Sequence, residues 1–441
     1  MMTIADKAVQ FLRDLIQFDT TNPPGNELPA AQYIGDVLQQ EGIEPVVLES
    51  APSRGNVVAR LPGDGSAGPL LLMSHLDVVP ADPQEWDHAP FAADVEDGYI
   101  WGRGAVDTKQ LTAMQLAVLT TLKRENVPLK RDVVLAATAD EEVGGIHGMG
   151  WLVQNHAQLV DCEYAINEGG GFGIEVRGQR FYVCQTGEKG VCWMKLTARG
   201  TPGHGSIPRG DNAVQKLSAA LARLSRARLP QHRTTTVDFL VRSLAAALGF
   251  PVSLVLPLAL HPLLERTILQ RMESQSEVTA VLRATLHNTV SPTVLRAGQK
   301  TNVIPSEATA EVDGRLVPGQ QPEDLLREMR PYIGDDVEVD IIADSRPYES
   351  EPASPLFELF QEVLAERDPG CRLVPFLVPG ATDGRFLADK DVKVYGFSPA
   401  RQEPGWRILD LAHARNERIS LANMDFGSQV LYDIVRRFCA K

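Results

Sequence analysis

The chain has 441 residues and a formal net charge of −14. This length favours two domains over one, and the acidic balance argues against nucleic acid as the main partner, because phosphate binding needs an excess of Lys and Arg on one face. The hydrophobic share of 44% and the charged share of 23% are typical of an ordinary globular protein rather than a disordered or membrane protein.

The cysteines and the first residues of the chain indicate the cellular compartment that is expected for the protein. An odd number of cysteines without C-x-x-C spacing predicts neither a disulfide framework nor a thiolate zinc site, and a start without an apolar run predicts no signal peptide, so a cytoplasmic location is expected. The most apolar stretch, 239–264, is interrupted by Arg242, His261 and several prolines, which argues against a transmembrane segment. The five cysteines are Cys162, Cys184, Cys192, Cys371 and Cys439.

Helix and strand signals alternate along the first part of the chain, which predicts an α/β fold with a mostly parallel twisted sheet flanked by helices. The predicted helices cover residues 6–18, 29–41 and 111–122. The predicted strands cover residues 56–61, 69–74, 132–138, 164–167 and 392–397. Each strand is short and apolar enough to be buried on both faces.

Between residues 190 and 347 the order changes to strand, helix, strand, strand, helix, strand, which is typical of a small α+β domain of the ferredoxin-like kind. Its two helices are predicted at 211–225 and 321–332, and the apolar, proline-punctuated stretch 229–286 is predicted to be an extra helical segment. We therefore expect a first domain made of residues 1–187 and 349–441, interrupted by a second domain at 188–348.

Polar side chains that can bind metal follow three of the predicted strands. His75 and Asp77 come after one strand, Glu141 and Glu142 after another, and Glu168 after a third. Because the carboxyl ends of parallel strands share one edge of a sheet, these clusters can converge there. Taken singly, each pair is more typical of a solvated surface or a hydrogen-bonded strand end, but the joint pattern and the glycines around it favour a site.

Asp107, just before an apolar helix, completes a mixed set of imidazole and carboxylate groups, which suits Zn²⁺, Co²⁺ or Mn²⁺. Asp107 is the natural candidate to bridge two ions about 3.5 Å apart. Of the adjacent Glu141 and Glu142, one can bind metal while the other moves protons, because neighbouring side chains on a strand-end loop can face different sides of a site.

The same residues lie in motifs that resemble the family of acetylornithine deacetylase, aminoacylase, carboxypeptidase S and glutamate carboxypeptidase. The resemblance covers nearly the whole chain in order. The motifs are 74–80 (SHLDVVP), 102–109 (GRGAVDTK), 140–144 (DEEVG), 167–170 (NEGG), 200–206 (GTPGHGS), 301–305 (TNVIP), 313–315 (DGR), 380–383 (GATD) and 413–417 (HARNE).

The resemblance implies two divalent metal ions and a role for each matched residue. One ion is expected between His75, Asp107 and Glu168, and the other between Asp107, Glu142 and His413. Asp77 is expected to orient His75, and Glu141 to act as the general base. The five expected metal ligands are thus His75, Asp107, Glu142, Glu168 and His413.

The family also implies that His204, in the second domain, stabilises the oxyanion, often at the site of a partner subunit, so a lid or dimerisation role for that domain and a homodimer are expected. Asn302 and Arg315 match positions that contact the substrate's terminal carboxylate, and the loop at Gly380 lines the same pocket. The segment 229–286 resembles the longer carboxypeptidase S and N-acyl-amino-acid hydrolase branch.

The sequence therefore predicts a two-metal hydrolase that cleaves an amide or peptide bond next to a free carboxylate, as a carboxypeptidase, dipeptidase or N-acyl-amino-acid deacylase, with metal-bound hydroxide as the nucleophile. Zn²⁺ is the preferred ion, with Co²⁺ or Mn²⁺ as alternatives. Two other functions stay open: a metal-binding homologue without catalysis, and a two-metal phosphoesterase, although the motifs hold few basic residues besides Arg103 and Lys109.

Overall fold

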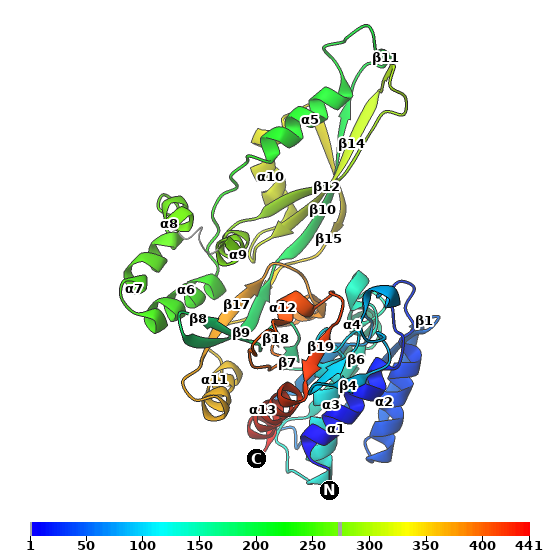
Figure 1. Cartoon of the computed structure of the whole chain (residues 1–441), viewed down its shortest axis with the longest axis vertical. Helices are drawn as coiled ribbons and strands as arrows, with labels where there is room; N and C mark the ends of the chain where they lie inside the picture. Colours follow the sequence, from blue (N-terminus) through cyan, green and yellow to red (C-terminus); the bar gives the residue numbers. More distant parts are fainter. Residues whose placement is uncertain (1, 272–275) are drawn as a thin grey trace. The chain divides into compact units, whose positions relative to one another are not determined.

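The computed structural model describes residues 2–271 and 276–441 and divides the chain into two compact units (Figure 1). Unit 1 comprises Met1–Thr186, Ser350–Phe376 and Thr382–Lys441, and unit 2 comprises Gly187–Glu349 and Leu377–Ala381. Most of unit 2 is therefore one continuous insertion in the sequence of unit 1.

Unit 1 is built on a mixed sheet with a parallel centre. Strands β6, β3, β7 and β18 run parallel in that spatial order, whereas β2 joins β6, and β9 joins β18, in antiparallel fashion. The strands of the sheet are β1 Pro45–Ala51, β2 Arg54–Leu61, β3 Leu70–His75, β6 Val133–Thr138, β7 Tyr164–Asn167, β8 Gly173–Val176, β9 Gln179–Glu188, β16 Tyr348–Glu349, β17 Arg372–Val378 and β18 Lys393–Gly396. The predicted α/β class is confirmed, but the strand expected at 56–61 runs antiparallel.

Every residue of β3, β6 and β7 is buried, so both faces of the central strands are covered. Helices α1, α3 and α13 pack against one another and supply much of this cover. The helices of unit 1 are α1 Ile4–Ile16, α2 Leu28–Gln40, α3 Lys109–Arg124, α4 Met149–Asn155, α11 Pro355–Arg367, α12 Ile408–Leu411 and α13 Leu421–Cys439, and a small separate sheet contains β4 Asp94–Glu96, β5 Tyr99–Trp101 and β19 Arg418–Ser420.

Unit 2 contains a four-stranded antiparallel sheet in the order β12-β14-β10-β15, against which α5 and α10 pack. The chain order is β10, α5, β12, β14, α10, β15, as the sequence predicts for an α+β domain. The elements are β10 Gly190–Arg199, β11 Gly203–His204, α5 Ala213–Leu224, β12 Thr289–Ala297, β13 Val303–Ile304, β14 Glu307–Leu316, α10 Pro322–Ile333 and β15 Val337–Asp344.

The segment 229–286 is mostly helical in its described residues, and residues 272–275 lie outside the described part. It contains α6 Thr235–Leu248, α7 Val252–Val255, α8 Glu265–Arg271 and α9 Ser276–Leu286. Val237, Val241 and Leu260 form part of a small core of their own. Among the helices in the described ranges 2–271 and 276–441, none combines the length and the apolar character of a membrane span.

A buried ionic group joins α2, β2 and the turn after β6. The guanidinium of Arg54, at the start of β2, lies 2.5 Å from the Asp140 carboxylate and 3.2 Å from that of Glu27, at the N-terminus of α2. Both oxygens of Glu27 are buried and have no hydrogen-bond partner among the described residues. Burial, reinforced by the negative charges of Asp77 and Asp140, raises the pKa of Glu27 to about 7, although Arg54 opposes this shift.

Replacing Glu27 by a neutral side chain should change how the free energy of unfolding depends on pH. Because the pKa of Glu27 is higher in the folded than in the unfolded chain, its contribution is fully present below the ordinary value of 4.5 and is lost as the pH rises through 7. The free energy of unfolding of Glu27→Gln, relative to the parent protein, should therefore rise by about 3 kcal/mol between pH 4.5 and pH 8. Urea denaturation of metal-free protein measures this difference, and a constant difference across that range would contradict the assignment.

Candidate metal centre

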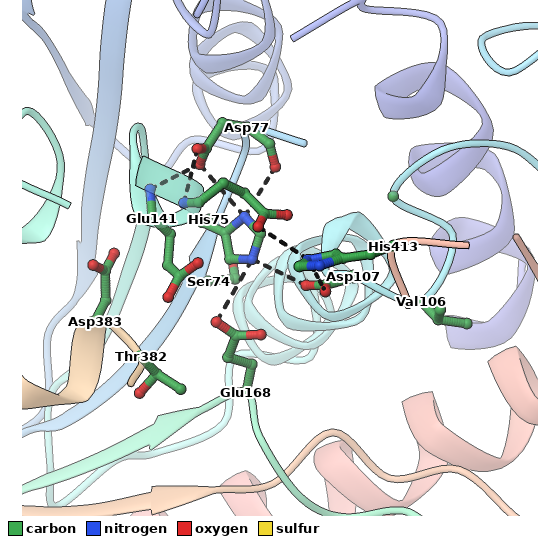
Figure 2. A network of polar contacts seen from close by, with 12 residues as sticks. Ser74, His75, Asp77, Val106, Asp107, Glu141, Glu168, Thr382, Asp383 and His413 are labelled. Carbon is green, nitrogen blue, oxygen red and sulfur yellow. Dashed lines mark hydrogen bonds and ion pairs between the residues drawn. The ribbon is translucent and has the colours of Figure 1, made fainter. Parts of the chain in front are cut away.

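Three strand ends of unit 1 bring the predicted metal-binding residues together (Figure 2). His75 is the last residue of β3 and is in register with Thr138, the last residue of β6. Glu141 and Glu142 lie in the short 3₁₀ turn that follows β6, and Glu168 comes directly after β7. Parallel pairing therefore sets the side chains of three distant segments at one edge of the sheet.

Asp107 lies between two histidines and faces both. Its Oδ1 is 3.3 Å from Nε2 of His75, and its Oδ2 is 3.1 Å from Nε2 of His413. Each carboxylate oxygen thus has its own imidazole, which is the arrangement of a carboxylate that bridges two ions.

The remaining donors divide into the same two groups. Nε2 of His75 lies 3.6 Å from Oε1 of Glu168, and Nε2 of His413 lies 3.0 Å from Oε2 of Glu142. Donor atoms around a tetrahedral ion are separated by roughly 3.4 Å when the bonds are about 2.1 Å long, so these spacings fit an ion in each group. The other oxygen of Glu142 is buried and has no hydrogen-bond partner among the described residues, which leaves it available to a cation.

Glu141 also lies in this cluster, because a carboxylate oxygen of Glu141 and donor atoms of His75 and Glu168 all lie within 4.8 Å of one another. Figure 2 shows its carboxylate between those of Glu168 and Asp383. The geometry leaves two roles open to Glu141, that of a ligand and that of a base beside the ions.

The electrostatics of the cluster favour cations. Burial opposes protonation of His75, but Glu168, Asp107 and Asp77 together hold its pKa well above the ordinary value. Hydrogen bonds to Asp107 and Glu142 raise the pKa of His413 to about 10. Burial and the Glu168 charge raise the pKa of Glu141 well above the ordinary value. Without metal, the carboxylates thus draw protons onto their neighbours to offset their negative charge.

Asp77 holds the site in two ways. Nδ1 of His75 lies 2.9 Å from the main-chain oxygen of Asp77 and 3.5 Å from its carboxylate, so a proton on Nδ1 leaves Nε2 free to bind metal. The carboxylate itself accepts hydrogen bonds from the backbone N–H groups of Glu141 and Glu142 at 3.0 and 3.1 Å. Asp77 therefore positions the glutamates as well as His75.

Two residues that support the site, Asn22 and Arg54, could not be predicted from the sequence. Asn22 donates from its side-chain amide to Asp77 at 2.8 Å and to Asp140 at 3.3 Å. Arg54 binds Asp140, whose left-handed φ of 75° turns the chain back toward Asp77 after β6. The run Thr20-Thr21-Asn22-Pro23-Pro24-Gly25 signals a loop, but no local pattern signals that this loop meets a site more than fifty residues further along the chain.

The other predicted site residues belong to unit 2. His204 is exposed in β11 and its Nδ1 lies 2.7 Å from the Ser206 hydroxyl, and Asn302 lies in the turn before β13, the partner strand of β11. Arg315, near the far end of β14, is paired with Asp313 at 2.8 Å. Gly380 lies in the short part of unit 2 after β17.

The sequence of this chain is similar to the sequences of known proteins. Residues 71–437 match the family model described as peptidase family M20/M25/M40. An N-fatty-acyl-amino acid synthase/hydrolase of Xenopus tropicalis is 29% identical over 388 residues, which cover 83% of this chain and 72% of the relative. Human aminoacylase-1 is 27% identical over 421 residues, covering 93% and 90% of the two chains.

Solved structures show the same fold. A metallo-carboxypeptidase of this family from Sulfolobus solfataricus is similar over 98% of both chains, with a TM-score of 0.71 and 17% sequence identity. A dipeptidase from Saccharomyces cerevisiae is similar over 98% of this chain and 95% of its own, with a TM-score of 0.66 and 16% identity. The chain therefore belongs to peptidase family M20/M25/M40, which confirms the resemblance seen in the motifs and the prediction that the protein is a hydrolase.

Proposed function

We propose that the protein is a two-metal hydrolase that cleaves the amide bond of an N-acyl amino acid or small peptide next to a free carboxylate. The observation that carries the proposal is Asp107, whose two carboxylate oxygens each face a different histidine. A carboxylate that served only an ion pair or a strand end would not need two imidazoles 3.1 and 3.3 Å away on opposite oxygens.

The ligand sets proposed are those expected from the motifs: His75, Asp107 and Glu168 for one ion, and Asp107, Glu142 and His413 for the other. Two ions held there would polarise the scissile carbonyl and make a water molecule more acidic. Nitrogen and oxygen donors in this geometry suit Zn²⁺, with Co²⁺ or Mn²⁺ as alternatives. The cytoplasmic location remains a prediction, supported by five free and buried cysteines.

Glu141 is the proposed general base. It lies beside the ligands, and its backbone N–H is fixed by Asp77, so its carboxylate can take a proton from the attacking water and return it to the leaving amine. This division of roles also distinguishes the enzyme from a metal-binding homologue without catalysis, which would not need a carboxylate held beside the ligands.

The relatives support N-acyl amino acids among the candidate substrates, because they include an N-fatty-acyl-amino acid synthase/hydrolase and aminoacylase-1. A phosphoesterase would require cationic side chains on the phosphoryl group. Of the two basic residues in the motif that carries Asp107, Lys109 donates to the main-chain oxygens of Leu15 and Phe18, and Arg103 is paired with Glu417. Both are therefore engaged in holding the fold.

The adjacent glutamates should separate chemistry from metal binding. Glu141→Ala should lower kcat by about 10²-fold or more, because the base is lost, while the metal content measured by mass spectrometry stays near that of the parent protein. Glu142→Ala should lower the metal content itself, because a ligand is lost. Equal loss of metal in both variants would contradict this division of roles.

The arrangement within unit 2 supports a homodimer with shared sites. β14 runs from Glu307 to Leu316, so roughly 26 Å of strand separate Glu307 from Arg315 at about 3.3 Å per residue. His204, in β11, and Asn302, in the turn before β13, lie beyond the Glu307 end of β14, at the tip of unit 2 (Figure 1). One small carboxylate cannot reach both ends of this strand. Because the resemblance implies that His204 acts at the site of a partner subunit, we infer that His204 and Asn302 serve that site and that Arg315 serves a different one.

Mixing two inactive variants tests this inference. A chain with His204→Ala keeps its own Glu141, and a chain with Glu141→Ala can lend its His204, so a mixed dimer regains one complete site. Equal amounts of the two chains, unfolded and refolded together, should recover about a quarter of the parent activity if chains pair at random.

Each variant refolded alone is the control and should stay inactive. No recovery in a mixture whose mixed dimers are demonstrated by differently tagged chains would show that each chain supplies its own His204.

A further inference from the structure

Another buried carboxylate, that of Glu417, lies four residues after His413 and belongs to neither proposed ligand set. Its side chain is fully buried. Its Oε1 accepts hydrogen bonds from the backbone N–H groups of Val106 at 2.7 Å and Asp107 at 3.0 Å, and its Oε2 accepts one from the N–H of Gly104 at 3.0 Å. The loop that carries the bridging aspartate is thus wrapped around one carboxylate.

Arg103 completes this contact from the other side. Its guanidinium donates to Oε2 of Glu417 at 2.7 Å and to the main-chain oxygen of His413 at 3.5 Å. The backbone N–H of Gly102 in turn donates to the main-chain oxygen of Glu417 at 3.0 Å. Hydrogen bonds therefore run in both directions between the Asp107 loop and the segment that carries His413.

The backbone of the His413 segment needs such support. His413 and Asn416 both have left-handed φ angles, of 62° and 59°, which are unfavourable for residues other than glycine and persist only where the surroundings hold them. Asn416 is held by Asp87, which receives its side-chain amide at 2.8 Å and donates its own backbone N–H at 2.9 Å. The main-chain oxygen of His413 itself accepts a hydrogen bond from the guanidinium of Arg103, which is paired with Glu417.

We propose that Glu417 is a positioning residue that sets the spacing between Asp107 and His413 and thereby governs the affinity of the ion they share. This inference rests on the proposed two-metal function. The ion between Asp107, Glu142 and His413 depends on two segments that Glu417 joins, whereas His75 and Glu168 are fixed at the ends of β3 and β7 by the sheet itself. The two ions should accordingly differ in their dependence on Glu417.

Glu417→Gln is the informative substitution because it keeps the volume and one acceptor oxygen. The oxygen can still accept from Val106 and Asp107, but the amide nitrogen would then face the N–H of Gly104 and the guanidinium of Arg103, donor against donor. The carboxylate is therefore required for its charge and for both of its acceptors.

The chain offers a matched control in Asp132→Asn. The Asp132 carboxylate also binds an arginine and a loop N–H, those of Arg60 and Gly63, each at 2.7 Å, but it lies at the opposite, amino-terminal end of β6 from the cluster. The control therefore loses the same kind of contact without touching the ligand segments.

The test is titration of metal-free protein with Co²⁺, followed by visible absorption, which reads metal binding without reference to activity. The parent protein should bind two ions. In Glu417→Gln one of the two binding steps should lose about tenfold or more in affinity, as is usual for residues that hold metal ligands, while the other step stays near that of the parent protein. Both binding steps of Asp132→Asn should also stay near the parent values. Thermal unfolding of the metal-free variants checks that each is folded.

Two unchanged affinities in folded Glu417→Gln, or an equal loss in Asp132→Asn, would overturn the positioning role. If Glu417→Gln does not fold, Arg103→Lys serves instead, because it keeps the charge and loses the second contact, the one to the main-chain oxygen of His413. One binding step should again lose affinity, and two unchanged steps would overturn the role. A parent protein that binds fewer than two ions would reject the two-metal function itself, and with it this inference.

Discussion

The parallel pairing of β3 with β6 and β7 is the constraint on which the site depends. Because these strands are in register, with His75 opposite Thr138 and Leu72 opposite Ile166, the chain leaves the sheet at one edge three times. The residues that directly follow these three strands are therefore held close together. The covered faces of these strands make that edge rigid, since none of their residues is exposed.

Charge is the second determinant. Four carboxylates lie beside two imidazoles, those of His75 and His413, at this edge; the carboxylates are those of Asp107, Glu141, Glu142 and Glu168. Their negative charge holds the pKa values of both histidines high. Burial raises the pKa of Asp77, but the hydrogen bond to His75 and the charge of that imidazole, together with hydrogen bonds from Asn22 and the backbone N–H of Glu142, hold it below the ordinary value. The fold thus stabilises a concentration of carboxylates that a divalent cation can neutralise better than protons can.

Much of this could be predicted from the sequence, because a strand that is buried on both faces has a continuous apolar pattern and its end is easy to locate. His75, Glu141, Glu142 and Glu168 were recognisable for that reason, and Asp107 by its place before α3. The antiparallel direction of β2 could not be predicted, since an apolar run does not reveal which way a strand is paired. Asn22 and Arg54 were also out of reach, because their role depends on contacts between distant segments. The proposal that His204 and Arg315 serve different sites depends on the length of β14, which separates the two residues within unit 2.

The most direct test of the account is the metal content of the purified protein together with its hydrolysis of N-acyl amino acids and dipeptides, before and after treatment with a chelator. The account predicts two divalent ions per chain, cleavage that the chelator abolishes, and recovery on addition of Zn²⁺, Co²⁺ or Mn²⁺. Protein that binds no metal and cleaves none of these substrates after metal is supplied would contradict it.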